Sequence, residues 1–219
     1  MSTQPSTDTV DGIAAPHSIP VPAAPTGLIT STAAAAPTTA PAAPTTQAAP
    51  ATVAEPDAPT LDELLAFAKK AAADPELIAR LRTLPDERSW IPLDGPAGSE
   101  AWVIGWPPGA ETGWHDHGGS VGAFVTAVGA LHESSLAVPL PGAGWSSLEL
   151  LPDLDRERTL SAGAGRAFGA HHVHQVVNPS QYEHAISVHV YYPPLPLIRR
   201  YSRRGRVLGL ETVERPEQW

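Results

Sequence analysis

The sequence predicts an all-β domain, a barrel or sandwich, preceded by a short helical segment and a long unstructured tail. Three observations carry this prediction: a break in composition near residue 57, a brief helical periodicity after it, and a succession of short apolar stretches from Trp90 onward. Many short strands without a long helix among them are typical of β-barrels and β-sandwiches. We therefore divide the chain into a tail, residues 1–57, and one folded domain, residues 58–219.

The tail is rich in Ala, Pro and Thr and contains neither Lys nor Arg. It has too few large apolar side chains to offset the entropy that ordering would cost, so we expect it to be disordered. The remaining part, about 160 residues, is large enough for one stable core.

Charge and cysteine content restrict the setting and the partners. The formal net charge is −9, which opposes general affinity for nucleic acid. No stretch is apolar for the roughly 18 residues that a membrane helix needs, and the tail lacks the pattern of a signal peptide. The chain contains no cysteine, which is consistent with a reducing compartment. We expect a cytoplasmic monomer or weak homo-oligomer with no nucleic-acid or membrane partner.

Two helix starts are visible at the beginning of the domain. Thr60 followed by Glu63 forms the pattern of a capping box ahead of an apolar helical stripe. Asp74 followed by Pro75 predicts a second helix, whose apolar periodicity continues until Pro85 stops it.

The strand predictions rest on alternating or continuous apolar runs bounded by Gly, Pro, Asp or Asn. An Arg-rich stretch, residues 198–206, is interpreted as a solvated surface strand or loop, with a nucleic-acid or anion patch as the alternative. The strands are expected at residues 101–106, 122–128, 131–136, 148–151, 165–168, 174–177 and 185–191.

The histidines carry the chemical information. Eight of the nine lie between residues 115 and 189. His115 and His117 are two positions apart, so in an extended strand both imidazoles point to the same face. His174, at the start of a later strand, completes a set that suits iron, zinc, copper or nickel, whereas magnesium and calcium prefer oxygen. His172 is an alternative third ligand, because it lies on the same face if that segment is extended.

The spacing around these histidines resembles the two sequence motifs of the cupin superfamily, Gly109-x5-His115-x-His117 and His174-x3-Asn178. The resemblance implies a cupin barrel, also called a double-stranded β-helix or jelly roll. The first motif normally continues with a glutamate that completes the ligand set. Val121 and Gly122 occupy the corresponding positions here, so the predicted set is three neutral imidazoles with room for an anionic substrate. Glu133 is an alternative fourth ligand.

Three stretches in the right order resemble the cysteine dioxygenase (thiol dioxygenase) family of cupins: residues 106–120, 174–180 and 185–194. The resemblance implies that His115, His117 and His174 hold Fe(2+), and that a small thiol reacts with O2 to give a sulfinate, with cysteine as the default substrate. It also implies a catalytic relay of Ser187, His189 and Tyr191, in which the tyrosine hydroxyl faces the substrate. It further makes Tyr192-Pro193 a candidate cis peptide bond.

Two positions depart from the family pattern. Animal members crosslink a cysteine to the catalytic tyrosine, but Gly122 occupies that position, as in bacterial members. Members that use cysteine grip its carboxylate with an early arginine, and mercaptopropionate-type members have glutamine there. Ungapped counting places Ser89 at this position, with Arg88 beside it. Arg88 and Tyr191 are therefore the candidate substrate-binding residues, and a C-terminal arginine is the alternative to Arg88.

Two other functions fit the same motifs. One is a cupin that uses zinc, nickel or manganese for isomerisation or hydrolysis, and the other is a non-catalytic cupin that binds a small ligand. Metal analysis separates the first from an iron dioxygenase, and oxygen consumption with a panel of thiols separates the second.

Overall fold

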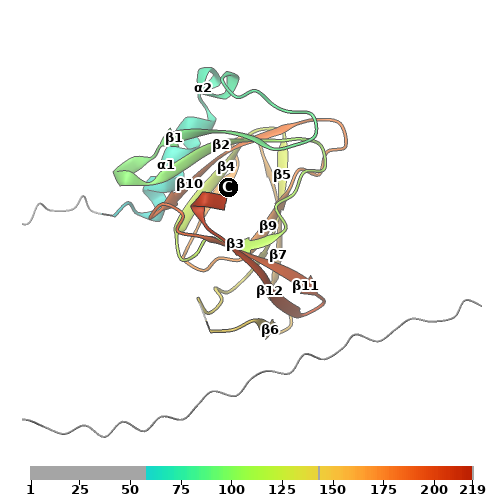
Figure 1. Ribbon diagram of the computed structural model, residues 1–219. Helices are drawn as coiled ribbons and strands as arrows, with labels where there is room; N and C mark the ends of the chain where they lie inside the picture. Colours follow the sequence, from blue (N-terminus) through green and yellow to red (C-terminus); the bar gives the residue numbers. More distant parts are fainter. Residues whose placement is uncertain (1–57, 143, 219) are drawn as a thin grey trace, which may run out of the picture. The chain divides into compact units, whose positions relative to one another are not determined.

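The computed structural model describes residues 58–142 and 144–218 (Figure 1). The prediction that residues 1–57 are disordered lies outside this range. No helix within the described ranges is long and apolar enough to cross a membrane.

The two predicted helix starts are confirmed. Helix α1 (Leu61–Ala72) begins with the capping box, in which Thr60 N–H donates to the Glu63 carboxylate at 2.8 Å and Glu63 N–H donates to Thr60 Oγ1 at 3.2 Å. Helix α2 (Pro75–Ala79) begins at Asp74, whose carboxylate accepts from two backbone N–H groups of its first turn. The expected continuation to Pro85 is wrong: α2 ends at Ala79, and Leu81 instead packs into the core beside α1.

The remainder of the domain is two antiparallel sheets, which confirms the all-β prediction. The first sheet has the order β1 (Ser89–Asp94), β2 (Glu100–Trp106), β10 (Ala185–Tyr192), β4 (Val121–Val128) and β8 (Gly165–Phe168). The second has the order β6 (Ser147–Glu149), β12 (Val207–Glu214), β11 (Ile198–Arg204), β3 (Trp114–Asp116), β9 (His174–Val177), β5 (Ala130–Leu136) and β7 (Asp155–Ser161). Short 3-10 turns occupy Pro96–Gly98 and Pro216–Gln218.

Each predicted strand corresponds to a strand of the structure. The bounds agree at 165–168 and 174–177 and differ by one or two residues at the others. Strands β1, β3, β7, β11 and β12 are additional to the predicted ones, although β11 lies in the Arg-rich stretch for which a surface strand was one interpretation. The bond between Tyr192 and Pro193 is cis, as expected.

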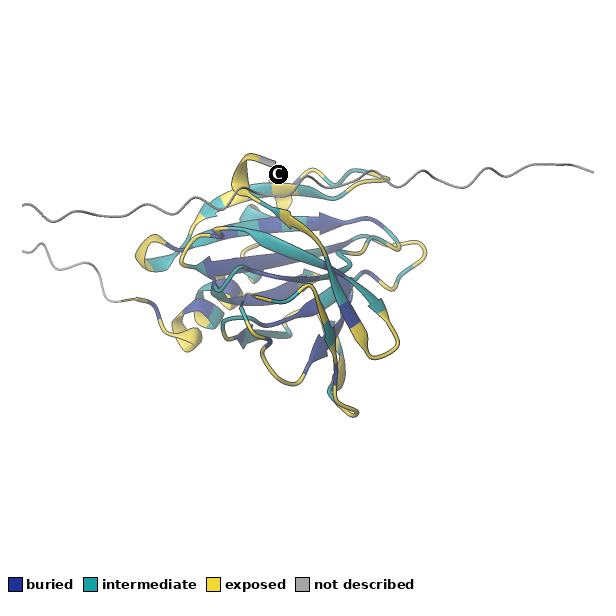
Figure 2. Ribbon diagram, turned by 60° about the horizontal axis from the view of Figure 1, so that its bottom comes forward, coloured by how far each residue is buried: buried dark blue, intermediate teal, exposed yellow. Residues whose placement is uncertain are grey.

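The first sheet is buried on both faces. Helix α1 packs on β4, β8 and β10, over a core that includes Leu64, Val103 and Val188. The opposite face contributes Trp106 and Phe124 to a second core cluster between the sheets. Figure 2 shows the buried residues concentrated on the strands, while the loops at their ends are exposed. Side chains that alternate inward from β2, β4 and β10 therefore meet those of β3 and β9, and this is where the candidate site lies.

Candidate metal centre and substrate cavity

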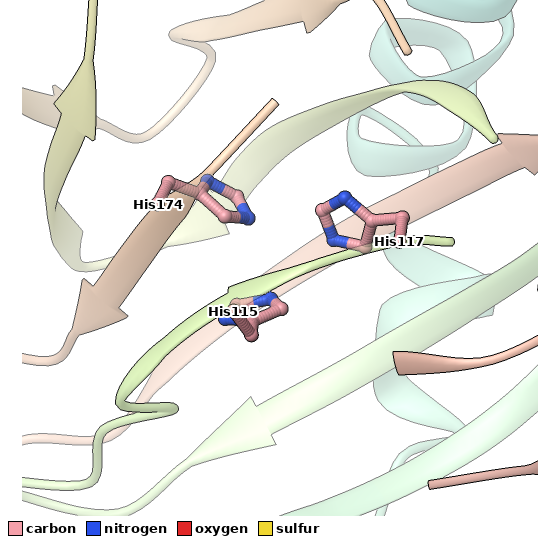
Figure 3. Close-up of side chains that lie close together, drawn as sticks. All are labelled: His115, His117 and His174. Carbon is pink, nitrogen blue, oxygen red and sulfur yellow. The ribbon is translucent and has the colours of Figure 1, made fainter. Parts of the chain in front are cut away.

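Three histidines converge inside the barrel (Figure 3). His115 lies on β3, His117 follows directly after that strand, and His174 is the first residue of β9. His115 and His174 are paired across the two strands. One ring nitrogen from each of the three histidines lies within 4.8 Å of the other two, so the predicted set can surround one ion.

Asp116, between the first two histidines, points away from the centre and anchors β3. Its buried carboxylate accepts hydrogen bonds from Arg199 Nη1 at 3.0 Å, Tyr201 Oη at 2.6 Å and Gly118 N–H at 2.8 Å. These bonds hold the strand against β11 and keep its neighbours on the inward face.

Hydrogen bonds to the Nδ1 atoms orient two of the imidazoles. His115 Nδ1 donates to the Gly113 carbonyl at 3.0 Å, and His174 Nδ1 donates to Glu133 Oε1 at 2.9 Å. Because both partners only accept, the protons lie on Nδ1, and the Nε2 lone pairs are left for a ligand. Among the described residues neither nitrogen of His117 has a partner, although both are buried. A buried, unpaired imidazole is costly, and a metal ion at this point would satisfy it.

The imidazoles of His115 and His117 are in the protonation state that a metal requires. Burial lowers the pKa of His115 and of His117 well below the ordinary value, and the neighbouring histidines lower it further. Both rings are therefore neutral near neutral pH, as metal ligation demands.

Glu133 supports the centre from behind and does not join the three-histidine cluster. Burial alone would raise its pKa, but hydrogen bonds from His172 and His174 and the charge of Arg166 lower the pKa, so this carboxylate is ionised. Arg166 Nη1 donates to it at 2.9 Å. His172 Nε2 also donates to Glu133, at 3.3 Å. His172, Glu133 and His174 form a second group that could hold a metal ion, so His174 belongs to both groups, whereas His172 does not cluster with His115 and His117.

The sequence analysis missed the bond between Glu133 and His174. Leu131, Glu133 and Ser135 alternate along β5 and are all buried. A carboxylate at an inward-facing position of a strand needs a buried partner, and this position of Glu133 was the signal in the sequence.

Of the two positions at which the cupin glutamate was expected, Val121 and Gly122, the second has no room for a side chain. A Cβ on Gly122 would lie 2.7 Å from the Phe168 ring and 2.7 Å from the Val190 carbonyl oxygen. Phe168 fills the space and stacks on His117 with ring centroids 5.0 Å apart. Neither a ligating carboxylate nor a crosslinking cysteine fits at residue 122 without movement of its neighbours.

Alternate residues of β10 form a hydrogen-bonded chain. Ser187 Oγ lies 2.8 Å from His189 Nε2, and His189 Nδ1 lies 3.2 Å from Tyr191 Oη. Trp106 Nε1, which can only donate, bonds Ser187 Oγ at 2.8 Å. This tryptophan was not anticipated, because the contact joins residues far apart in the sequence.

Burial sets the charge of this chain. It lowers the pKa of His189 to about 3 and raises the pKa of Tyr191 above its ordinary value. Both groups are therefore neutral at physiological pH. The Tyr191 ring lies 4.9 Å from that of His117, so the chain ends beside the metal centre.

A cavity of about 680 Å³ opens onto the three histidines and Tyr191. Its wall is largely aromatic and aliphatic, and Arg88 and Arg200 provide positive charge. The lining includes Trp90, Trp102, Ile104, Trp106, Leu195 and Ile198.

The structure places Arg88 in the cavity and Ser89 outside it. The Arg88 guanidinium lies 5.4 Å from the centre of the Trp106 ring, and it makes no hydrogen bond or ion pair within the described ranges. Burial and the charge of Arg200 lower the pKa of Arg88. Ser89 begins β1 opposite Gly105, and its hydroxyl is buried without a partner in the described residues.

Arg200, by contrast, is already engaged. It donates through Nε to Glu214 and through Nη1 to the Thr112 carbonyl at 3.0 Å. Of the two arginines at the cavity, Arg88 is the one with its donors available for an anionic ligand.

Comparison with solved structures finds proteins of low sequence identity. An oxalate oxidase in complex with the substrate analogue glycolate is 16% identical, with 50% of this chain and 52% of that chain covered and a TM-score of 0.38. A protein from Thermus thermophilus is 19% identical, with coverage of 56% and 98% and a TM-score of 0.40. Lactobacillus farciminis oxalate decarboxylase in a formate complex is 15% identical, with coverage of 51% and 30% and a TM-score of 0.37. The chain thus spans about half the length of the oxalate oxidase.

No curated protein matches the sequence. A family model does, and it covers most of the chain: the model of cysteine dioxygenase type I matches residues 36–204. That range contains the three converging histidines and the hydrogen-bonded chain of β10. The chain belongs to the cysteine dioxygenase type I family of the cupin superfamily.

Proposed function

We propose that the protein is a non-haem iron dioxygenase that adds O2 to the sulfur of a small thiol carrying a carboxylate, with cysteine as the default substrate and a sulfinate as the product. The observation that carries the proposal is the meeting, in one cavity, of three imidazoles, the hydroxyl of Tyr191 and the guanidinium of Arg88, whose donors have no partner in the described residues. The reaction balances without another reductant, because one thiolate and one O2 give one sulfinate.

His115, His117 and His174 would hold the iron. The nitrogen atoms of the three rings lie close enough to surround one divalent ion, and the two ring nitrogens of His117 have no partner in the described residues. Because only three imidazoles would bind the ion, it would keep open positions. Iron(II) held there would supply the binding positions and electrons by which O2 is activated beside a thiolate sulfur.

Arg88 would bind the substrate carboxylate. Its planar guanidinium offers donors in a fork that matches a carboxylate, and it lies over the Trp106 ring. The second arginine of the cavity, Arg200, is paired with Glu214, so the charge available to the carboxylate is that of Arg88. The substrate would thus lie with its carboxylate at Arg88 and its sulfur toward the histidines.

Tyr191 would hold a proton toward the reacting atoms. Trp106 can only donate to Ser187, so every proton of the chain has an acceptor if Ser187 donates to His189 and His189 donates to Tyr191. The hydroxyl proton of Tyr191 is then left to point into the cavity. The raised pKa of Tyr191 keeps that proton in place.

The test is oxygen consumption by the full-length, iron-loaded protein with a panel of thiols, with metal content measured in the same preparation. We expect uptake of O2 with cysteine or another small thiol acid, and a sulfinate detected by mass. Tightly bound zinc without iron, in protein purified anaerobically, would instead favour isomerase or hydrolase chemistry. Iron-loaded protein that consumes no O2 with any thiol would favour a ligand-binding role.

A further inference from the structure

A second cavity, of about 390 Å³, lies apart from the first, and within the described ranges the two share no lining residue. It is bounded by the ends of β5, β7 and β8 and by the loop at residues 137–139. Its charged lining residues in the described part of the chain are three arginines, Arg156, Arg158 and Arg166, and His172 borders it as well. Among those same residues, no carboxylate lines it.

One buried carboxylate behind the wall balances only part of this charge. Glu133 Oε2 lies 2.9 Å from Arg166 Nη1 and 3.6 Å from Arg158 Nη1. In the part of the chain that the structure describes, Arg156 has no ion pair with Glu133 and donates only to the backbone carbonyls of Asp153 and Asp155. Three guanidinium charges thus face one carboxylate.

The acidic residues of β7 are occupied elsewhere. Asp155 is paired with Arg203, and Glu157 accepts from His132 and Ser134 on the other face of the hairpin formed with β5. This follows from alternation, since Arg156 and Arg158 are two residues apart on β7 and point to the same side. In the described ranges, neither Asp155 nor Glu157 forms an ion pair with an arginine of the cavity, although Arg203 and, less strongly, the charge of Arg156 lower the pKa of Asp155.

The guanidinium groups also keep unused donors. In the described ranges each of the three donates through Nη1 only: Arg166 to Glu133, Arg158 to Ser135 Oγ at 3.2 Å, and Arg156 to the two carbonyls. An arginine has five N–H donors in a planar fork, so Nε and Nη2 of each remain for a ligand. Arg158 and Arg166 have side chains 40% and 24% exposed, and a solute can reach them.

We propose that this cavity is a binding site for a small oxyanion, a phosphate or carboxylate group, held by Arg156, Arg158 and Arg166. Forked arginine donors match both head groups, and a partly enclosed site strengthens each charge-assisted bond. The proposal is independent of the reaction in the first cavity. It nevertheless places the anion next to Arg166, which is bonded to Glu133, the partner of His174.

The experiment is calorimetric titration of the full-length, metal-loaded protein with inorganic phosphate and, separately, with acetate, each at constant ionic strength. We expect one of these anions to bind at one site. Arg156→Gln should weaken binding roughly tenfold by removing one charge-assisted interaction. Arg156 is exposed and its contacts in the described ranges are to backbone carbonyls, so this variant should fold normally.

Arg158→Gln is the second variant and should weaken binding to a similar degree. Arg204→Gln is the matched control, because Arg204 is an exposed arginine that lines neither cavity, and it should leave the affinity unchanged. Arg88→Gln tests whether the anion enters the first cavity instead. Binding that only Arg88→Gln weakens, binding that survives both Arg156→Gln and Arg158→Gln, or no binding of either anion at millimolar concentration would overturn the proposal.

Discussion

At the scale of single residues, the proposed reaction depends on the hydroxyl of Tyr191. Replacing it by phenylalanine removes the proton at the end of the chain from Ser187 but keeps the ring that packs on His117. We expect Tyr191→Phe to slow turnover by roughly 100-fold or more, the usual loss when a positioned acid is removed, and to leave the iron content unchanged. Oxygen uptake and metal analysis on one preparation measure both.

Tyr192→Phe is the matched control for that variant. Tyr192 is the next residue of β10, packs with the core cluster beneath α1 and does not line the cavity. It should retain the rate of the unaltered protein. Equal rates for Tyr191→Phe and Tyr192→Phe would remove Tyr191 from the proposed mechanism.

Arg88 sets the expected choice of substrate. Arg88→Gln removes the charge that would bind the carboxylate, so KM for cysteine should rise by roughly tenfold or more. Cysteamine, which has the same thiol and amine but no carboxylate, serves as the internal control, and its KM should change little. The kinetics of both thiols, measured by oxygen uptake, check this. A parallel rise for both would mean that Arg88 supports the cavity and does not recognise the carboxylate.

Glu133 should set the affinity for the metal. Glu133→Gln removes the anion that accepts the Nδ1 proton of His174, and loss of such a partner typically weakens metal binding by about 10- to 100-fold. Competition with a chelator measures this affinity without any turnover. Glu157→Gln, on the exposed face of the neighbouring strand, is the control and should bind metal as before. Unchanged affinity in Glu133→Gln would reduce its role to balancing the arginines.

At the scale of elements, the capping box predicts a measurable stability. Thr60→Ala deletes the hydroxyl that caps α1 and should lower the free energy of unfolding by about 1 kcal/mol, because α1 covers the outer face of the first sheet. Thr60→Ser keeps the cap and should cost much less. Denaturant unfolding followed by circular dichroism compares the two. If both variants have the same free energy of unfolding as the original protein, the cap does not contribute to stability.

The elements that could be predicted are those whose buried residues form a recognisable pattern along the sequence. Strands β2 and β4 are mostly apolar runs, β10 alternates apolar residues with Ser187, His189 and Tyr191, and α1 has its cap and its apolar stripe. Strand β7, by contrast, reads Asp-Arg-Glu-Arg and lies at a sheet edge, and β11 carries four arginines. Such strands have no hydrophobic alternation, so only their pairing with distant partners reveals them.

Parts of the candidate site could likewise be predicted from local sequence patterns, and other parts could not. His115 and His117, and likewise the alternate residues of β10, share a face by strand periodicity and could be predicted. The hydrogen bonds of Glu133 to His174 and of Trp106 to Ser187 join strands that are far apart in the sequence, so no local sequence pattern predicts them. Whether Arg88 or Ser89 faces the cavity depends on the register of β1, because a shift of one residue moves a side chain to the opposite face of a strand.

At the scale of the whole molecule, the buried histidines make stability depend on pH. Burial lowers the pKa of His189 from 6.5 to about 3, so the folded protein keeps neutral an imidazole that the unfolded chain protonates. The unfolded state binds more protons in this window, and stability therefore falls as pH decreases from about 6.5 toward 3, by at most about 1.4 kcal/mol per pH unit from this residue.

Denaturant unfolding at several pH values tests this with His189→Gln, which cannot titrate. The stability of the original protein minus that of the variant should be constant above pH about 6.5 and should fall by about 2 kcal/mol by pH about 5. A difference that does not change with pH would mean that folding does not lower the pKa of His189.

The proposed reaction places both atoms of O2 on the sulfur of the substrate, and isotope labelling tests this directly. The full-length, iron-loaded protein is given cysteine under an atmosphere of oxygen-18, and the product is weighed by mass spectrometry. We expect cysteine sulfinate that carries two labelled oxygen atoms. A product with oxygen from water, one labelled oxygen atom alone, or unchanged cysteine would contradict it.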